Sequence, residues 1–286
     1  MSKIIFGIDV GGTTCKCGTF SKEGELLRKE EIPTRKDEGG SLILPDISEY
    51  IKGVLADMNM TTEDVAGIGM GLPGACLEDG TVNKCINLGW GVFNAANALS
   101  ELTGIPVKIG NDANMAALGE FWVGGGSEYN SMVMVTIGTG VGGGVIIDGK
   151  PLYGFNGAAG EIGHLPLVEG ETESCLEQVA SATGIVRTAN RMLAESDMPS
   201  SLRSVPYISA KVIFDEAKGG DALAIQVTEY VCRYLGKGLA CAAGMVDPEV
   251  FVIGGGVSAA GEYFINLIDK YYKECVFHAS RQTKIV

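Results

Sequence analysis

Short apolar runs alternate along this chain with longer stretches in which apolar residues recur every three or four positions. The short runs predict buried strands at residues 4–10, 65–72, 105–109, 132–137 and 250–253. The amphipathic stretches predict helices at residues 46–58, 93–102, 113–122, 176–194, 210–218 and 222–246, and from residue 261 onward. Strands that alternate with helices are typical of an α/β fold.

Two of the predicted strands end in a glycine-rich turn and are followed by a returning strand. The first passes through Asp9-Val10-Gly11-Gly12-Thr13 into residues 15–20, and the second passes through Gly138-Thr139-Gly140 into residues 145–147. Glycine lets a ligand approach the backbone closely, and consecutive amides form a concave site for phosphate. A tight turn without a ligand is the alternative for either hairpin alone. The repetition predicts a duplicated fold that holds a phosphate chain.

Residues 138–143 also match the glycine spacing GxGxxG of a dinucleotide site. That fingerprint must open a helix, whereas β-branched residues and then Asp148-Gly149 follow here, so we predict another hairpin.

A run of three glycines at 124–126 lies between the two repeats. We therefore predict a smaller N-terminal α/β lobe at residues 1–119 and a larger C-terminal α/β lobe at residues 120–286.

Asp112 is our candidate catalytic base. It follows the predicted strand at residues 105–109 and precedes the predicted helix at residues 113–122. In open α/β sheets, ligands collect beyond the carboxyl ends of strands, which points Asn111 and Asp112 toward a ligand. The alternative is that Asp112 or Asn111 only caps the helix by accepting its free amide hydrogens.

Other polar residues lie beside the glycine turns. Asp9 is suited to hold hydrated magnesium, Thr13 to offer a hydroxyl, and Lys16 to offset phosphate charge. Gly254-Gly255-Gly256 follows a strand and precedes a helix, which suits either the adenosine or phosphate end of a nucleotide or an ordinary tight turn.

Three further polar residues are candidates in the second half. Glu161 and His164 follow a glycine- and alanine-rich loop, and together they predict a polar pocket, although a lone histidine is more often a surface residue. Glu177 stands in the first turn of a predicted helix, where an acidic side chain also favours the helix dipole.

The charge of the chain argues against some partners. With 35 acidic and 22 basic residues the formal charge is −13, which disfavours binding to nucleic acid or to an anionic membrane. No apolar run approaches the ~20 residues that span a bilayer, and Met1-Ser2-Lys3 leads directly into a strand, so we expect a cytoplasmic protein. The eight scattered cysteines are expected to be reduced and mostly buried.

The motifs together resemble the ROK (repressor, open reading frame, kinase) sugar kinases, and within that family the bacterial glucokinases. The resemblance runs over essentially the whole chain and rests on seven motifs in a specific order. They are Asp9–Thr13, Gly71–Gly74, Gly110–Asn114, Gly138–Gly142, Gly160–His164, Cys175–Glu177 with Ala180–Gly184, and Ile253–Gly256.

The resemblance implies the duplicated actin-like ATPase fold of the ribonuclease-H type, in which two lobes surround a cleft for ATP and sugar. It implies Mg²⁺-dependent phosphorylation of the 6-hydroxyl of glucose by ATP, a step of glycolysis, in a homodimer or homotetramer. Asp112 would be the base. The implied sugar contacts are Gly74, Asn111, Asp112, Glu161, His164 and Glu177. The implied nucleotide contacts are Asp9, Gly11, Gly12, Thr13, Lys16, Gly138, Thr139, Gly140, Gly255 and Gly256.

The sequence departs from the family in one respect that concerns a metal. Relatives carry a zinc cluster of the form Cys-x-Cys-Gly-x-x-Gly-Cys after the residue that matches His164, but here residues 169–174 lead directly to Cys175. His164 and Cys175 alone cannot complete a tetrahedral zinc site. Either the metal has been lost or the sequence omits a few residues, and we expect the second. The family's closing helix is likewise missing after Val286.

Three alternatives to a glucose kinase remain. One is a ROK kinase for another hexose or for an N-acetylated amino sugar. A sugar-binding ROK regulator would need a basic helix-turn-helix before the first glycine hairpin, and only three residues precede Ile4. An ATPase without a small substrate would not need the polar set of Asn111, Glu161, His164 and Glu177.

Overall fold

The computed structural model describes residues 3–167 and 174–286, which form two compact units. The first unit contains the described residues up to Ala116 together with Leu152–Ala159, and the second contains the other described residues. The predicted lobes, divided between residues 119 and 120, differ from these units mainly in the segment Leu152–Ala159. That segment packs on the first unit because Gly157, at φ 72°, lies against the backbone of Cys76, where a Cβ would come within 2.4 Å of the carbonyl oxygen.

The first unit is built on a five-stranded sheet with the order β3-β2-β1-β4-β7. Its strands are β1 (Ile4–Val10), β2 (Thr14–Phe20), β3 (Leu26–Pro33), β4 (Val65–Leu72) and β7 (Val107–Asn111). The first three are antiparallel neighbours, whereas β4 runs parallel to β1 and β7 runs parallel to β4. Three neighbouring strands therefore end at the same edge of this sheet.

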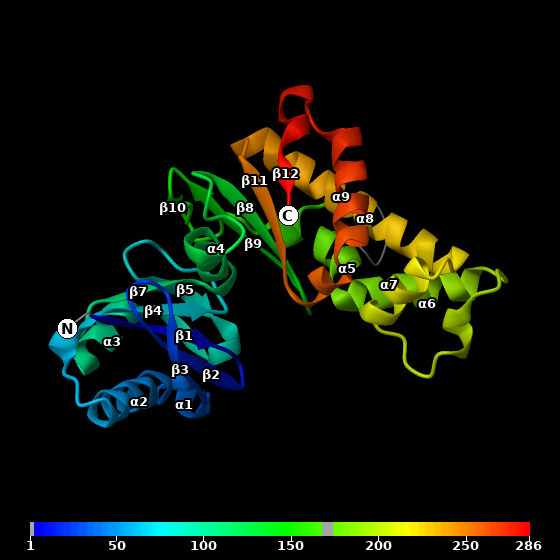
Figure 1. Cartoon of the computed structure of the whole chain (residues 1–286). Coiled ribbons are helices and arrows are strands. Elements are labelled where there is room, and N and C mark those ends of the chain that lie inside the picture. Colours follow the sequence, from blue (N-terminus) through cyan, green and yellow to red (C-terminus); the bar gives the residue numbers. More distant parts are fainter. Residues whose placement is uncertain (1–2, 168–173) are drawn as a thin grey trace. The chain divides into compact units, whose positions relative to one another are not determined.

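Helices and one small hairpin accompany this sheet (Figure 1). They are α1 (Asp37–Gly40), α2 (Ile43–Asp57), α3 (Ala95–Thr103), and the strands β5 (Thr81–Cys85) and β6 (Trp90–Asn94). Apolar residues of α2 and α3 form one core with the inward residues of β1 and β4, and among them Phe6, Ile47 and Leu99 are fully buried. Burying side chains of this size supplies most of the stabilisation of such a unit.

The second unit repeats the plan of the first. Its sheet has the order β10-β9-β8-β11-β12, formed by β8 (Met132–Ile137), β9 (Val141–Ile147), β10 (Lys150–Pro151), β11 (Val250–Gly254) and β12 (Lys284–Ile285). As in the first unit, the opening strand pairs antiparallel with its successor and parallel with a later strand. The antiparallel pairing of β8 with β9 confirms that residues 138–143 form a hairpin turn rather than open a helix.

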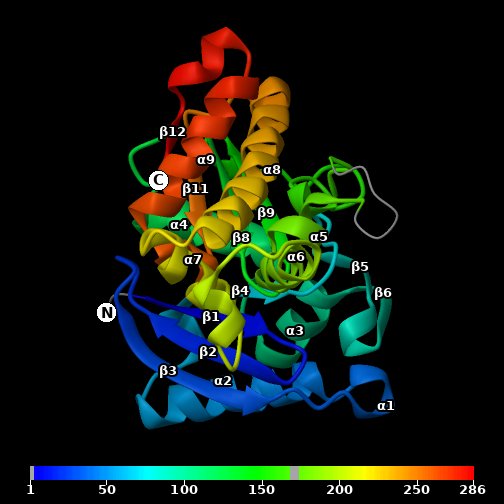
Figure 2. The ribbon, with the colours of Figure 1, turned by 90° about the vertical axis from the view of Figure 1, so that its right-hand side faces the viewer.

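Helices make up most of the rest of the second unit, and α4 (Asp112–Val123) begins in the first. They are α5 (Leu176–Ala180), α6 (Ala182–Glu195), α7 (Ala210–Lys218), α8 (Ala222–Val246) and α9 (Glu262–Cys275). The helices α8 and α9 lie side by side in both views (Figures 1 and 2). They approach closely at Gly236, where a Cβ would come within 2.6 Å of the backbone nitrogen of Tyr272.

Most predicted elements are present, and two predicted helices differ in their bounds. The strands at 4–10, 65–72 and 132–137 and the helices at 210–218 and 222–246 are confirmed, and the side chains of Ser209 and Asp221 cap these two helices, α7 and α8. The helix predicted at 46–58 begins at Ile43 instead, so that Asp46 lies within its first turn, where the Asp46 carboxylate accepts from Arg35. The helix predicted at 176–194 is interrupted at Ser181, whose extended backbone ends α5 and caps α6.

Across residues 3–167 and 174–286, no helix combines the length and the apolar character that crossing a membrane requires.

Asp221, the residue that caps α8, gives a test of the fold of the second unit. Burial raises the pKa of Asp221, but hydrogen bonds from the amides of Ala224 and Ser201 and from the hydroxyls of Ser200 and Ser201 outweigh it, so the pKa lies below 3.8. A lowered pKa contributes stability above the unfolded-state pKa and loses it as the pH falls through the folded-state value.

We therefore expect Asp221→Ala to destabilise the protein at pH 7 by about 1–2 kcal/mol. The difference from wild type should shrink once the pH falls below 3.8. Urea unfolding at a series of pH values measures it, with Glu274→Ala on the exposed side of α9 as a control that removes a carboxylate but no cap. An equal loss in both variants, or a loss independent of pH, would contradict the assignment.

Candidate active site

The candidate base lies at the edge where three parallel strands of the first unit end. Strand pairing sets Asp9 of β1 opposite Gly71 of β4, and Leu72 of β4 opposite Asn111 of β7. The residues that follow these strands are consequently neighbours. This edge brings together four of the residues predicted from the sequence, which are Asp9, Gly74, Asn111 and Asp112.

Asn111 performs the capping role that the sequence left open. Its Oδ1 accepts from the amides of Ala113 at 2.9 Å and Asn114 at 3.4 Å, and its Nδ2 donates to the carbonyl of Gly74 at 3.5 Å. The Asp112 carboxylate also accepts from the amide of Ala113, through Oδ1 at 2.8 Å, but its residue is solvent-accessible. Capping by Asn111 thus holds α4 in place while Asp112 faces accessible space.

The surroundings of Asp112 raise the pKa of its carboxyl group. Desolvation by the protein atoms around it raises its pKa above 3.8, even though the side chain is not sealed from solvent. The Asp9 carboxylate raises the pKa further by charge repulsion, whereas the hydrogen bond from Ala113 lowers it. Burial and a like charge are the two effects that make a carboxylate a better proton acceptor.

The first glycine turn is held from behind by a residue that the sequence analysis missed. The turn closes through a hydrogen bond from the Gly11 amide to the Thr14 carbonyl at 3.0 Å. Thr34 then donates from its hydroxyl to the Gly11 carbonyl at 2.8 Å and from its amide to the Thr13 carbonyl at 2.9 Å. A single threonine after a polar strand carries no sequence signal for this contact.

The predicted charge partners at this turn are both accessible. Lys16 Nζ lies 3.5 Å from Asp9 Oδ2, and each side chain is about half exposed, so screening keeps this ion pair weak. Space around Gly12 is open where a side chain would begin. The turn can therefore admit an anion, with Lys16 free to swing toward it.

Two buried thiols fix the turn that carries Gly74. Cys85 donates to the carbonyl of Pro73 at 3.2 Å, and Cys76 donates to the carbonyl of Gly74 at 3.6 Å. Burial raises the pKa of Cys76 to about 12, so this thiol keeps its proton and stays a donor. The sequence predicted buried cysteines, and their hydrogen bonds to this turn are an additional role that only the structure reveals.

In the second unit, the other two glycine segments lie against each other. The turn between β8 and β9 closes by a hydrogen bond from the Gly138 amide to the Gly140 carbonyl at 2.9 Å. Gly255, with φ 84°, packs so tightly on Ile137 that a Cβ would come within 2.4 Å of its carbonyl oxygen. The space beside Gly138 and Gly256 is open. Gly138–Gly140 and Gly255–Gly256 thus form one accessible strip of backbone.

The segment that carries Glu161 and His164 rests directly on β9. A Cβ on Gly163 would lie 2.1 Å from the carbonyl oxygen of Val141, and a Cβ on Gly143 would lie 2.3 Å from that of Gly160. Side chains at these positions would separate the two backbones. Glu161 and His164 are both exposed on this segment.

Glu177 is drawn to the same strand from α5. Its Oε2 accepts from the amide of Val141 at 2.9 Å, and a Cβ on Gly140 would lie 2.5 Å from that oxygen. Glu177 is in the first turn of its helix, as predicted, and it makes a specific contact beyond any interaction with the helix dipole. The strand β9 thus gathers Glu161, His164 and Glu177 beside the second glycine turn.

The described residues fit a nucleotide better than a zinc ion. Open, amide-rich glycine turns in both units suit phosphate oxygens. Within residues 3–167 and 174–286, no group of three or more His, Cys, Asp and Glu side chains is arranged to hold a metal. His164 and Cys175 therefore do not form such a group there, and most of the departure from the family's zinc motif, at residues 168–173, lies outside the described residues.

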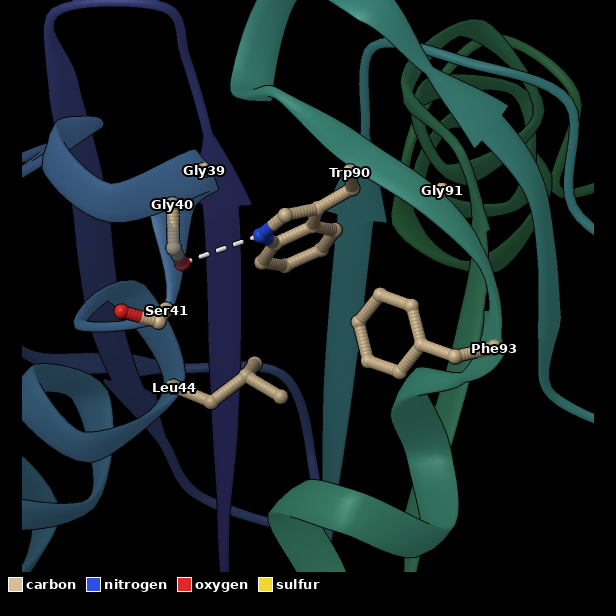
Figure 3. Close-up of a pocket in the computed structure, with 7 residues that line it drawn as sticks. All are labelled: Gly39, Gly40, Ser41, Leu44, Trp90, Gly91 and Phe93. Carbon is tan, nitrogen blue, oxygen red and sulfur yellow. Dashed lines mark hydrogen bonds between the residues drawn. The ribbon is translucent and has the colours of Figure 1, made fainter.

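A separate pocket of about 250 Å³ lies in the first unit between the start of α2 and the β5–β6 hairpin (Figure 3). Its lining is mainly apolar, and the Trp90 indole donates to the carbonyl of Gly40 at 3.0 Å while the rings of Trp90 and Phe93 meet edge to face. None of the site residues predicted from the sequence belongs to the lining of this pocket.

Comparison with known proteins gives a consistent result. A profile of the ROK family matches residues 5–286. A glucokinase of Halalkalibacterium halodurans is 40% identical over 279 residues, which make up 93% of this chain and 84% of the relative. An N-acetylmannosamine kinase of Citrobacter koseri is 30% identical over 90% of this chain and 84% of its own length.

A solved structure is similar over nearly the full chain. It is a ROK family glucokinase from Streptomyces griseus in complex with glucose and AMPPNP, with a TM-score of 0.74 and 30% sequence identity, covering 99% of this chain and 93% of that chain. Together with the two matching sheets, this likeness confirms the predicted actin-like, two-lobed α/β fold.

The electrostatic coupling at the sheet edge can be tested directly. We expect Asp9→Asn to lower the pKa of Asp112, because it removes a repelling charge and frees Lys16 from its partner. Carboxyl-carbon NMR titration of wild type and variant measures the shift. The matched control is Asp57→Asn at the end of α2, which should leave the titration of Asp112 unchanged. An unchanged Asp112 titration in Asp9→Asn would refute the coupling.

Proposed function

The chain belongs to the ROK family, and on that premise we propose that it transfers the γ-phosphoryl group of ATP to the 6-hydroxyl of glucose. The observation that carries the proposal is the position of Asp112. It stands at the shared end of β1, β4 and β7, beside the glycine turn that follows Asp9. A proton acceptor next to a phosphate-binding turn is the arrangement that phosphoryl transfer to an alcohol needs.

In this mechanism two glycine turns bind the phosphates of ATP. Gly11, Gly12 and Thr13 belong to the first turn, and Gly138, Thr139 and Gly140 belong to the second, with Gly255 and Gly256 nearer the nucleoside. Backbone amides in these turns stabilise charge that develops on the phosphoryl oxygens, without having to reorganise during the reaction. Mg²⁺, with Asp9 contacting it through water, would neutralise further phosphate charge when bound.

Polar groups hold the sugar. Asn111, Glu161, His164 and Glu177, with the turn at Gly74, can donate to or accept from vicinal hydroxyls and so set the orientation of the ring. Fixing the reacting hydroxyl close to the phosphorus supplies a large part of the acceleration in such reactions.

Asp112 then orients the 6-hydroxyl and accepts its proton. The hydroxyl oxygen forms a bond to the γ-phosphorus while the bond from that phosphorus to the β,γ-bridging oxygen breaks. The electron pair of the broken bond leaves with ADP, and the proton passes from the hydroxyl to Asp112 and afterwards to solvent. The transition state is loose, so the proton can move late and an ordinary carboxylate pKa would suffice; the surroundings of Asp112 raise its pKa above that ordinary value.

Sequence identity to two relatives favours glucose over other sugars as the substrate. The glucokinase of Halalkalibacterium halodurans shares 40% of the aligned residues, and the N-acetylmannosamine kinase of Citrobacter koseri shares 30%. The second relative makes an N-acetylated amino sugar the specific competing substrate. Both substrates would use the same base and the same glycine turns.

A coupled assay of ADP release over a panel of hexoses tests the proposal. We expect Mg²⁺-dependent turnover that requires a hexose, with glucose giving the highest kcat/KM and N-acetylmannosamine a much lower one. Preference for N-acetylmannosamine would transfer the proposal to the competing substrate. ADP release that no sugar stimulates would contradict both glucose and N-acetylmannosamine as the substrate.

The role of the base is tested by Asp112→Asn. The amide keeps hydrogen bonding to the sugar but cannot accept the proton, so we expect kcat to fall by about 10²–10⁴-fold while sugar binding is largely retained. In wild type, the acid limb of the pH profile should lie above pH 3.8, because the pKa of Asp112 is raised and only its ionised form is active.

The control for this variant is Asp57→Asn, which makes the same chemical change on the surface of the first unit. Near-normal turnover in Asp112→Asn, with the control also normal, would show that another group accepts the proton.

A further inference from the structure

Ser181 separates α5 from α6, and we call the junction at Glu177–Gly184 the α5–α6 corner. This corner makes three hydrogen bonds to the second glycine turn and the residue that follows it. The carboxylate of Glu177 accepts from the amide of Val141 at 2.9 Å. The amide of Ala182 donates to the carbonyl of Gly138 at 2.8 Å, and the hydroxyl of Thr183 donates to the carbonyl of Thr139 at 3.4 Å. All three contacts lie within the second unit. The conformation of the turn therefore depends on this corner.

The corner is itself well fixed. Ser181 has an extended backbone, with φ −66° and ψ 161°, and its Oγ accepts from the amide of Gly184 and hydrogen-bonds the hydroxyl of Thr183 at 3.1 Å. Gly184 crosses α5 so closely that a Cβ would lie 2.5 Å from the carbonyl oxygen of Gln178. Val179 and Ile185 on either side are fully buried. A rigid corner can impose its geometry on a flexible glycine turn.

The pattern of these contacts has a specific effect on the peptide groups of the turn. In a trans peptide, the carbonyl of one residue and the amide of the next point in opposite directions. Holding the carbonyls of Gly138 and Thr139 against the corner therefore turns the amides of Thr139 and Gly140 away from it. Amides that face outward together form an anion site, whereas outward carbonyls would repel phosphate.

We infer that Thr183 and Glu177 are positioning residues for the nucleotide, acting through the α5–α6 corner to orient the amides of Thr139 and Gly140 toward phosphate. The inference rests on the proposed function, in which this turn binds ATP. Glu177 then has two duties. It fixes the phosphate-binding turn through Val141, and it is also a candidate contact of the sugar, so one carboxylate joins the two substrate sites of this unit.

Two pairs of variants separate the positioning of the glycine turn from the contact with the sugar. Thr183→Val removes the hydroxyl and Thr183→Ser retains it, and Thr183 is exposed, so neither change disturbs the core. Glu177→Ala removes the acceptor for the Val141 amide. Glu177→Gln retains an oxygen acceptor there but loses the charge that a sugar hydroxyl would meet.

The measurement is the affinity for ADP by isothermal titration calorimetry in the absence of sugar, followed by KM for ATP and for glucose. Loss of one such hydrogen bond should weaken ADP binding roughly fivefold in Thr183→Val and Glu177→Ala. Thr183→Ser should bind ADP like wild type. Glu177→Gln should also bind ADP like wild type while its KM for glucose rises, whereas Thr183→Val should raise KM for ATP with little change in KM for glucose.

Each outcome decides the inference. Unchanged ADP affinity in both Thr183→Val and Glu177→Ala overturns it, and so does equal weakening in Thr183→Val and Thr183→Ser, since packing rather than the hydroxyl would then matter. If wild type turns over ATP with a hexose while these variants bind ADP normally, only the positioning role fails. If wild type binds no ADP and phosphorylates no sugar, the proposed function fails together with it.

Discussion

Direct contact between backbones along β9 is the constraint on which the candidate site residues of the second unit depend. The segment that carries Glu161 and His164 reaches the strand only because Gly143, Gly160 and Gly163 have no side chains to hold it off. Gly140 likewise leaves room for the carboxylate of Glu177. These four glycines are therefore explained by close packing, rather than by turns alone.

The two units use the same strand plan for different chemical tasks. In the first, three parallel strands end together and bring carboxylates to one edge, where repulsion and desolvation raise the pKa of Asp112. In the second, a single strand gathers three polar side chains beside the second glycine turn. A duplicated sheet can thus present a carboxylate with a raised pKa in one unit and a group of hydrogen-bonding side chains in the other.

Sequence patterns predicted the frame of the molecule well, because strands such as 4–10 and helices such as 210–218 depend on neighbouring residues. They failed where distant contacts decide. Nothing local at Ser181 announces that the helix breaks there, since the break is fixed by Gly184 crossing α5 and by the link to Gly138. Thr34 behind the first turn and the thiols behind Pro73 and Gly74 were missed for the same reason. The roles of the candidate site residues remain predictions, although the structure gathers them into two groups.

The placement of Leu152–Ala159 with the first unit affects how the chain can be divided. The polypeptide passes from one unit to the other after Ala116, again after Pro151, and a third time after Ala159. No uninterrupted stretch of the gene encodes either unit in full. An attempt to express one half alone would strip it of a piece such as the loop around Gly157, which is anchored on Cys76. Three crossings of the polypeptide therefore connect the two units, even though each has its own sheet and its own core.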